Sequence, residues 1–363
     1  MLKLAAALAA GGVGVAVYLH PPDCVKGWVE SHPYLCAAAY SGVVGCVIRK
    51  LPRATPDCVD PTGKAVFITG CDTGFGQLLA KRLHDVGYMV FAGCLAPERN
   101  GALRLIQSKS RRMHVIQLDV TDEFHVQRAL DYVSEHLDGA ELWAVVNNAG
   151  LAVVSEIEWC SVDQFQRLLD VNVLGVVRVT KAFLPLLRQS CGRVINVASL
   201  AGRLTLPMYA AYSMSKKAVV AFSDALRQEM RKFNVSVISI EPGLYKTPIA
   251  TADTLITSNK ESWSQTPTAI KEDYGEEYFD AAMGKIRDSM GRARVRVEEV
   301  IEQMELAVCA RTPRHRYVPY WATWVRSEIL AFLPTVLSDK IFAAAAPKVK
   351  PQFIVRQESF RAL

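Results

Sequence analysis

Short apolar runs rich in branched residues alternate with amphipathic stretches from residue 64 onward. Such runs are typical of buried strands, whereas apolar residues every three or four positions indicate helices. The predicted strands span residues 65–69, 89–92, 115–118, 142–146, 194–197, 235–240 and 315–318, and the clearest helices span 77–86, 122–137 and 162–187. This alternation predicts an α/β fold, a doubly wound parallel sheet of Rossmann type with sites at the carboxyl ends of its strands.

The first 60 residues follow a different pattern. Leu4 to Leu19 and Tyr34 to Ile48 are almost wholly apolar, and each is near or below the lower limit of about 17 residues for a spanning helix. Basic residues follow the second run at once, namely Arg49, Lys50 and Arg53. Such residues favour the cytosolic side for what comes next. We expect residues 1–62 to form a membrane anchor and linker; the alternatives are a signal peptide or a buried apolar extension.

A glycine-rich stretch separates the first predicted strand from the helix that follows. Its sequence is Gly70-Cys-Asp-Thr-Gly74-Phe-Gly76. Backbone N–H groups of such a turn, together with the helix dipole, can bind a pyrophosphate. The spacing is G-x-x-x-G-x-G rather than G-x-G-x-x-G, so the position between strand and helix carries the prediction of a dinucleotide site.

Tyr212 and Lys216 lie four residues apart on a predicted helix that opens near Tyr209. This spacing places both side chains on one helix face. An ammonium beside a phenol favours the phenolate, so we expect a lowered pKa for Tyr212; a shift of ~3 units takes ~4 kcal/mol. Ser199, at the end of the strand before this helix, could polarise a substrate oxygen. The alternative is a solvated helix face that carries Tyr-x-x-x-Lys by chance.

Asn172 stands near the middle of the long helix predicted over residues 162–187. Asn is a poor helix former and is usually found there at the surface. Its neighbours Val171, Val173 and Leu174 are apolar, which favours a buried side chain with a specific role.

Composition narrows the classes of function. The net charge is +6 without a basic run, which argues against nucleic acid as a partner. Nine cysteines include no C-x-x-C pair, and their odd number argues against a complete disulfide framework. The seven histidines show no ligand spacing, so we expect no metal site.

These residues together resemble the motif set of the short-chain dehydrogenase/reductase superfamily. The matching stretches are Thr69–Gly76, Asn147–Gly150, Asn172, Ser199, Tyr212-x-x-x-Lys216 and Pro242-Gly243, in order over residues 64–318. Finer features resemble one branch: Thr69–Asp72, Phe91–Leu95, Leu142–Asn148 and Asp273–Phe279. That branch holds the membrane-bound retinol dehydrogenases, the type 2 17β- and 11β-hydroxysteroid dehydrogenases and the mitochondrial D-3-hydroxybutyrate dehydrogenase.

The resemblance implies a role for each matching residue. Tyr212 would exchange a proton with the substrate alcohol, and Lys216 would lower the pKa of Tyr212 and bind the nicotinamide ribose. Ser199 would orient the substrate oxygen, and Asn172 would hold a water that links Lys216 to solvent. Tyr212 and Lys216 would share cofactor binding with Gly70, Asp72, Thr73, Gly74, Phe75, Gly76, Asp119, Asn147, Ala149, Gly150, Pro242, Gly243 and Thr247.

The expected cofactor is NAD, with NADP as the alternative. NAD enzymes usually place an acidic residue at the end of the second strand, but Gly93 or Cys94 occupies that position here. Asp72 in the glycine turn would repel a 2′-phosphate, and Arg99 is the nearby cation that could bind one. The branch that the chain resembles mostly uses NAD.

Residues 244–290 should determine the substrate. They form the least regular part of the predicted domain and mix apolar residues with Thr and Ser, which suits a lid over a lipophilic ligand. No cluster of Lys and Arg stands in this stretch. The expected activity is hydride transfer between a nicotinamide cofactor and a primary or secondary alcohol, as in a hydroxysteroid or retinol dehydrogenase. The alternatives are a D-3-hydroxybutyrate dehydrogenase-like enzyme and a non-catalytic dinucleotide-binding scaffold.

The C-terminal residues 319–363 are expected to form an amphipathic, membrane-associated tail. Aromatic residues gather before an apolar stretch, namely Tyr317, Tyr320, Trp321 and Trp324. Aromatic rings with polar edges favour the headgroup level, although the same residues could complete a core or a homo-oligomer interface. We expect the endoplasmic reticulum membrane, with the catalytic domain of residues 63–318 in the cytosol. A mitochondrial location is disfavoured because no Arg precedes Arg49.

Overall fold

The computed structural model describes residues 57–107, 110–248, 251–343 and 346–361. The two apolar runs that predict a membrane anchor lie outside these residues. Among the described helices, none combines the length and the apolar character needed to cross a bilayer.

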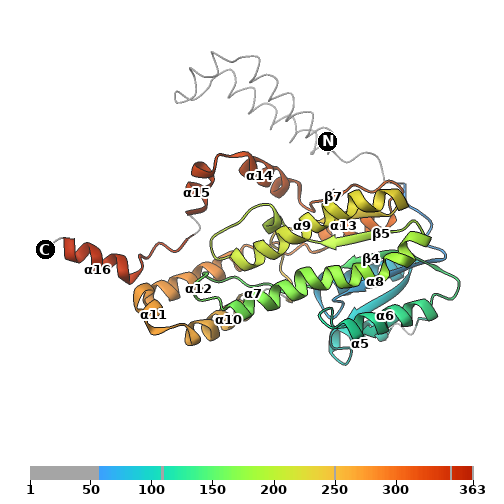
Figure 1. The fold of residues 1–363 in the computed structure, drawn as a ribbon, viewed down its shortest axis with the longest axis horizontal. Helices are drawn as coiled ribbons and strands as arrows, with labels where there is room; N and C mark the ends of the chain where they lie inside the picture. Colours follow the sequence, from blue (N-terminus) through green and yellow to red (C-terminus); the bar gives the residue numbers. More distant parts are fainter. Residues whose placement is uncertain (1–56, 108–109, 249–250, 344–345, 362–363) are drawn as a thin grey trace, which may run out of the picture. The chain divides into compact units, whose positions relative to one another are not determined.

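Seven parallel strands form one sheet, in the order β3-β2-β1-β4-β5-β6-β7. Figure 1 labels β4, β5 and β7 within this sheet. Their bounds are β1 Lys64–Thr69, β2 Met89–Cys94, β3 Met113–Gln117, β4 Glu141–Asn147, β5 Arg193–Val197, β6 Ser236–Ile240 and β7 Arg316–Tyr317. The predicted parallel Rossmann-type sheet is therefore confirmed, and each strand lies within two residues of its predicted bounds. The strand order reverses between β1 and β4, which places a binding crevice at the carboxyl ends of these strands.

Helices cover both faces of the sheet. The helices α4 (Gly74–Val86), α5 (Asn100–Ile106) and α13 (Glu298–Cys309) contribute to one buried cluster with alternate strand residues such as Val66 and Ile68. On the other face lie α6 (Glu123–Glu135), α8 (Gly175–Gln189) and α9 (Ala210–Met230), which pack against Ala65 and Phe67. Successive strand side chains point to opposite faces, so burial on both faces explains why the strands have continuous apolar sequences.

The long helix predicted over residues 162–187 is interrupted. α7 (Val162–Leu169) is followed by a π-helical turn, η1 (Asp170–Leu174), and then by α8. The buried Asn172 lies in this turn. Single π-helical turns inside helices occur frequently at functional sites, and here the turn presents an amide side chain toward the loop after β4.

Residues 244–290 are largely helical, so the prediction that they are irregular was wrong. They contain α10 (Ala252–Gln265), α11 (Thr268–Tyr274) and most of α12 (Glu276–Gly291). Thr251 caps α10 by accepting a hydrogen bond from the Thr254 amide. An aromatic cluster around Trp159, with Trp263 4.9 Å and Phe279 5.4 Å away between ring centroids, packs these helices together. Helicity here depends on this tertiary cluster more than on local propensity.

The C-terminal residues form α14 (Trp321–Phe332), α15 (Thr335–Ala343) and α16 (Gln352–Arg361). Tyr317, which the sequence groups with the aromatic residues of the predicted membrane contact, lies in β7 and is buried, so it completes the core instead. Tyr320 carries the guanidinium of Arg294 3.6 Å from its ring centroid. Of the predicted aromatic group, Trp321 is exposed, and several apolar side chains of α14 and α15 are exposed as well.

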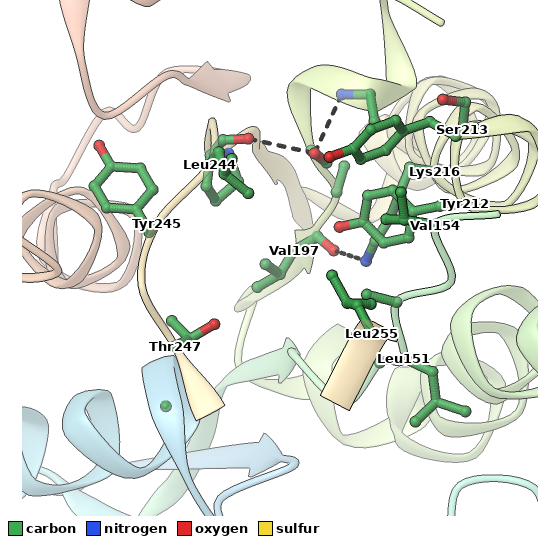
Figure 2. A pocket seen from close by; sticks show the side chains of 18 of the residues that line it. Leu151, Val154, Val197, Tyr212, Ser213, Lys216, Leu244, Tyr245, Thr247 and Leu255 are labelled. Atoms are coloured by element: carbon green, nitrogen blue, oxygen red, sulfur yellow. Dashed lines mark hydrogen bonds between the residues drawn. The ribbon is translucent and has the colours of Figure 1, made fainter. Parts of the chain in front are cut away.

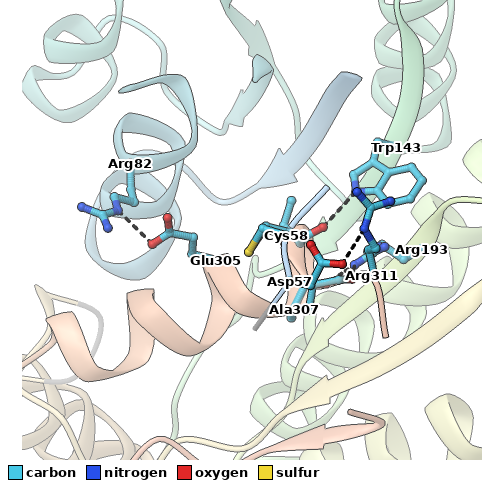
Figure 3. Close-up of a disulfide and its surroundings, with 11 residues drawn as sticks. Asp57, Cys58, Arg82, Trp143, Arg193, Glu305, Ala307 and Arg311 are labelled. Carbon is cyan, nitrogen blue, oxygen red and sulfur yellow. Dashed lines mark hydrogen bonds and ion pairs between the residues drawn. A yellow bond between two sulfur atoms is a disulfide. The ribbon is translucent and has the colours of Figure 1, made fainter. Parts of the chain in front are cut away.

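A disulfide joins Cys58, before β1, to Cys309 at the end of α13 (Figure 3). Cys58 pairs with Ala310 in a short antiparallel bridge, beside which the Val59 amide donates to the Cys309 carbonyl at 2.7 Å. An ion pair between Arg311 and Asp57, at 2.8 Å, flanks the bridge. The two cysteines are 251 positions apart in the sequence. The bond therefore links the segment before β1 to α13, the last helix that packs against the sheet.

Candidate active site

The glycine turn after β1 is fixed by the loop after β4. Thr69 Oγ1 accepts hydrogen bonds from the amides of Asn148 and Ala149, and Asn148 Nδ2 donates to the carbonyls of Thr69 and Gly70, all at 3.0–3.1 Å. Gly70 has φ +71°, and a Cβ there would lie 2.8 Å from the Ala149 Cα. Only glycine permits both this backbone conformation and this approach.

A cavity of about 1920 Å³ opens at the carboxyl ends of the strands. Most residues that the resemblance assigned to the site line it: Gly70, Asp72, Thr73, Gly74, Phe75, Asp119, Ala149, Gly150, Ser199, Tyr212, Lys216, Pro242, Gly243 and Thr247. Gly76, Asn147 and Asn172 do not. The fold thus brings the glycine turn, the Ser–Tyr–Lys residues and the loop after β6 to one cavity.

Asn147 was assigned to the cofactor site, but the structure places its side chain elsewhere. It is buried and donates to Thr180 Oγ1 at 2.9 Å and to Asn196 Oδ1 at 2.8 Å, beneath the cavity. The next residue, Asn148, lines the cavity and was missed. The sequence contains both asparagines side by side, and only the strand register decides which one points toward the glycine turn.

The residues at the end of β2 that face the cavity are not Gly93 or Cys94, the two positions expected to meet the cofactor ribose. Cys94 is the last residue of β2 and is fully buried, and neither it nor Gly93 lines the cavity. The cavity is lined instead by Leu95 and Ala96, whose amides both donate to the Asp72 carboxylate at 2.9 Å. Asp72 therefore places its negative charge beside the end of β2.

The Ser–Tyr–Lys residues come from the end of β5 and from α9; Figure 2 shows Tyr212 and Lys216 in the cavity. Ser199 follows β5 and caps the short 3₁₀ turn η2 (Leu200–Gly202): its Oγ accepts from the Ala201 amide at 3.1 Å and donates to the Pro242 carbonyl at 3.3 Å. Tyr212 and Lys216 lie on α9, one turn apart. Lys216 Nζ donates to the Val197 carbonyl at 2.9 Å and lies 5.8 Å from the Tyr212 ring centroid.

The protein alone does not lower the pKa of Tyr212, contrary to the sequence-based expectation. Burial raises the pKa of Tyr212 to about 12, and a hydrogen bond with Ser199 opposes this shift. Burial also lowers the pKa of Lys216 to about 8. Desolvation disfavours the charged form of each group, and the ammonium is directed toward the Val197 carbonyl, which weakens its effect on the phenol.

Asn172 is satisfied by protein atoms. Its Oδ1 accepts from the Leu151 amide at 2.7 Å, and its Nδ2 donates to the Leu151 carbonyl and to Ser215 Oγ, each at 3.0 Å. A Cβ on Gly150 would lie 3.2 Å from Asn172 Oδ1 and 3.6 Å from Lys216 Nζ. Asn172 therefore joins the loop after β4 to α9 close to Lys216, while its water-binding role stays a prediction.

A charged network connects the end of β6 to α14, which lines the cavity. Glu241, at the end of β6, is fully buried and pairs with Arg203 at 2.5 Å and with Arg316 at 3.3 Å. Arg203 also pairs with Glu328 of α14. α14 lines the cavity with Thr323, whose methyl group would lie 3.3 Å from a Cβ on Gly243. The network thus connects α14 to the turn that follows Ser199.

The chain after β6 contributes four basic residues to the lining of the cavity. They are Lys285, Arg292, Arg294 and Arg326. Arg294 is paired with Glu299 at 2.7 Å, whereas Arg292 and Arg326 are exposed. Only Lys285 comes from residues 244–290, which agrees with the absence of a basic cluster in that stretch. The tertiary structure, however, adds basic residues from other segments.

Several known dehydrogenases are similar to this chain in sequence. The rat mitochondrial D-beta-hydroxybutyrate dehydrogenase is 39% identical over 290 residues, covering 77% of this chain and 84% of that protein. Retinol dehydrogenase 5 from mouse is 39% identical over 285 residues, covering 78% and 89%. Human 17-beta-hydroxysteroid dehydrogenase type 6 is 38% identical over 286 residues, again covering 78% and 89%.

Solved structures share the fold. A short chain dehydrogenase/reductase from Burkholderia phymatum in complex with NAD aligns with a TM-score of 0.60 and 20% identity, over 81% of this chain and 99% of that one. A Burkholderia cenocepacia short chain dehydrogenase in complex with NADP gives 0.57 and 22%, over 76% and 96%.

The residues present fit a nicotinamide cofactor. The glycine turn exposes backbone amides where a side chain at Gly70 would clash with Ala149, and it opens directly into α4, whose N-terminus favours a diphosphate. Residues 64–255 match the short chain dehydrogenase family. The chain therefore belongs to the short chain dehydrogenase family, and it is an oxidoreductase that acts on CH–OH groups with a nicotinamide cofactor.

Proposed function

We propose that this enzyme interconverts a hydroxyl and a carbonyl on a lipophilic alcohol, such as a hydroxysteroid or retinoid, with NAD as its preferred cofactor. The observation that carries the proposal is the meeting of Ser199, Tyr212 and Lys216 in a cavity whose other walls are mainly apolar. Those walls include Leu151, Val154, Leu206, Met208, Leu255, Ile286, Met290 and Leu330. Apolar walls with a few convergent polar groups are typical of sites for apolar ligands.

Each polar residue has a distinct task in the proposed mechanism. The Tyr212 phenol donates a proton to the substrate oxygen during reduction and accepts it during oxidation. The Ser199 hydroxyl holds the same oxygen, which polarises the C–O bond. Lys216 keeps a positive charge near the phenol and thereby favours the phenolate during proton transfer. A nicotinamide cofactor bound in the cavity would supply or accept the hydride. Asn172 positions the loop that faces Lys216.

A second candidate substrate is a hydroxy acid, as in D-beta-hydroxybutyrate dehydrogenase. The basic residues around the cavity, such as Lys285 and Arg326, favour this candidate because a carboxylate needs a cationic partner. The volume of the cavity, even with space reserved for a dinucleotide, is better matched to a larger apolar body. A panel of retinoids, hydroxysteroids and 3-hydroxybutyrate assayed with each cofactor separates the two.

NAD is favoured over NADP by the position of Asp72. Its carboxylate lies at the end of β2, where the ribose of the adenosine is bound in this type of fold. A 2′-phosphate there would meet a like charge in a partly desolvated site, which is unfavourable.

The membrane of the endoplasmic reticulum is the proposed location. Several exposed side chains of α14 and α15 are apolar, including Trp321, Ile329, Val336 and Ile341. The same two helices line the cavity with Leu330 and Phe342. Contact of these helices with a bilayer surface would place the cavity where apolar substrates concentrate.

Replacing Tyr212 by Phe should abolish turnover while leaving cofactor binding nearly unchanged, because only the proton-transferring oxygen is lost. Steady-state kinetics and cofactor fluorescence titration measure the two properties. Tyr209→Phe is the matched control, since Tyr209 also lines the cavity and begins the same helix. Turnover by Tyr212→Phe equal to that of the wild type would refute the proposed mechanism.

The rate of alcohol oxidation should rise with pH from pH 6, because the pKa of Tyr212 is raised to about 12 and the phenolate is the proton acceptor. The limiting slope is about tenfold per pH unit. The slope should decrease near pH 8, where Lys216 loses its charge. In Lys216→Arg, whose charge persists, this decrease should disappear. A profile of kcat/KM that is flat between pH 6 and 8 contradicts these assignments.

Asp72→Asn should improve the use of NADP relative to NAD by about tenfold or more, because it removes a like charge near the 2′-phosphate. The ratio of kcat/KM values for the two cofactors measures the effect. Glu98→Gln makes the same charge change at an exposed residue of the cavity and is the control. An unchanged ratio in Asp72→Asn, or preference of the wild type for NADP, would overturn the assignment.

Glu328→Gln should raise KM for the alcohol several-fold with little effect on KM for the cofactor, because α14 loses its charged link to Arg203. The glutamine retains the size of the side chain and can still accept a hydrogen bond from Trp324. Glu305→Gln, which breaks an ion pair with Arg82 on another helix, is the control. Equal KM values for the alcohol in both variants would show that α14 does not shape the site.

A further inference from the structure

An Asn-Val-Ser sequence occupies the turn before β6. Asn234 is the C-cap residue that follows the short 3₁₀ turn η3 (Arg231–Phe233), and Ser236 is the first residue of β6. The Asn234 side chain is exposed, while Val235 between them is buried. Asn-x-Ser with a residue other than proline in the middle is the acceptor pattern for N-linked glycosylation, and it requires a surface position.

The local backbone explains only part of this pattern. Asn234 has φ 56° and ψ 21°, in the left-handed region, where asparagine and glycine are the favoured residues. Glycine would serve the turn equally well. The backbone places no demand for a hydroxyl at residue 236, which enters the strand by donating its amide to the Gly192 carbonyl at 3.0 Å. The backbone conformation therefore does not explain why Asn234 and Ser236 occur together.

The turn lies at the opposite end of β6 from the active site. Ser236 begins the strand, whereas Pro242, two residues beyond its carboxyl end, lines the cavity. Five residues of strand separate the two ends by about 16 Å. A glycan on Asn234 would project from the amino edge of the sheet and leave the cavity accessible.

The disulfide is an independent observation about the compartment. Cys58 and Cys309 are linked, and the carbonyls of Ala307 and Ala310 beside Cys309 accept hydrogen bonds from the Arg193 guanidinium at 2.9 Å. Disulfides persist in the endoplasmic reticulum lumen and outside the cell, and they are rare in the cytosol. Attachment of N-linked glycans and disulfide formation share this compartment.

We propose that Asn234 is an N-glycosylation site and that the catalytic domain faces the lumen of the endoplasmic reticulum. This is the side opposite to the one that Arg49, Lys50 and Arg53 predict. The Asn234 amide nitrogen bonds to C1 of an oligosaccharide from a lipid diphosphate donor; the bond from C1 to the diphosphate breaks and the amide loses a proton. The Cys58 and Cys309 thiols lose two electrons and two protons to a protein disulfide, which is reduced to two thiols.

Synthesis of the full chain in the presence of microsomes tests the glycan. The wild type should run with lower mobility, and endoglycosidase H should remove the shift. Ser236→Ala and Asn234→Gly should both run unshifted, because one lacks the hydroxyl and the other lacks the acceptor amide while keeping the left-handed turn. A wild-type chain whose mobility endoglycosidase H does not change refutes the modification.

A thiol-labelling experiment on the same preparation tests the orientation. After denaturation, a maleimide of high mass should label the wild type at two more cysteines following reduction than before it. The double variant Cys58→Ser, Cys309→Ser should show no such gain. Labelling of both cysteines in the wild type without reduction would overturn the lumenal orientation. Alcohol oxidation is measured on the same preparation, so that failure of the proposed orientation can be distinguished from failure of the proposed activity.

Discussion

The buried carboxylate of Glu241 is the constraint on which much of the active-site architecture depends. It is fully shielded from solvent at the end of β6, so its charge has to be paired. Arg203 and Arg316 supply the partners, and they bind Glu328 and Asp224 in turn. A single buried charge thereby joins the turn after Ser199, the edge strand β7, helix α9 and helix α14. Removing one partner from such a group typically costs about 3–5 kcal/mol.

The chemistry of the site follows from desolvation. Tyr212 and Lys216 line the cavity from α9, and burial raises the pKa of Tyr212 and lowers that of Lys216, so that both shifts favour the neutral forms. The phenol is therefore held protonated near neutral pH, which suits a proton donor for carbonyl reduction. Oxidation in the reverse direction requires additional stabilisation of the phenolate, which the proposed mechanism assigns to the Ser199 hydroxyl and the Lys216 charge.

The two edges of the sheet carry different features. The carboxyl edge carries the cavity, which residues of α10 and α12 help to line, and the charged network around Glu241. The amino edge carries the disulfide of Cys58 and the turn at Asn234. Covalent reinforcement at this second edge is compatible with catalysis because it leaves the walls of the cavity unaltered. The proposed lumenal orientation and the proposed activity are thus independent properties of one fold.

The sequence by itself determined the sheet, the glycine turn and the Ser199, Tyr212 and Lys216 group. These features are local: buried strands require continuous apolar runs, and a spacing of four residues on a helix defines a shared face. The tertiary structure decided what depends on distant partners. It selected Asn148 over Asn147 through strand register, made residues 244–290 helical through the Trp159 cluster and joined Cys58 to Cys309. It also reversed the expected pKa shift of Tyr212, because burial depends on every element packed around the phenol and cannot be deduced from the one lysine nearby in sequence.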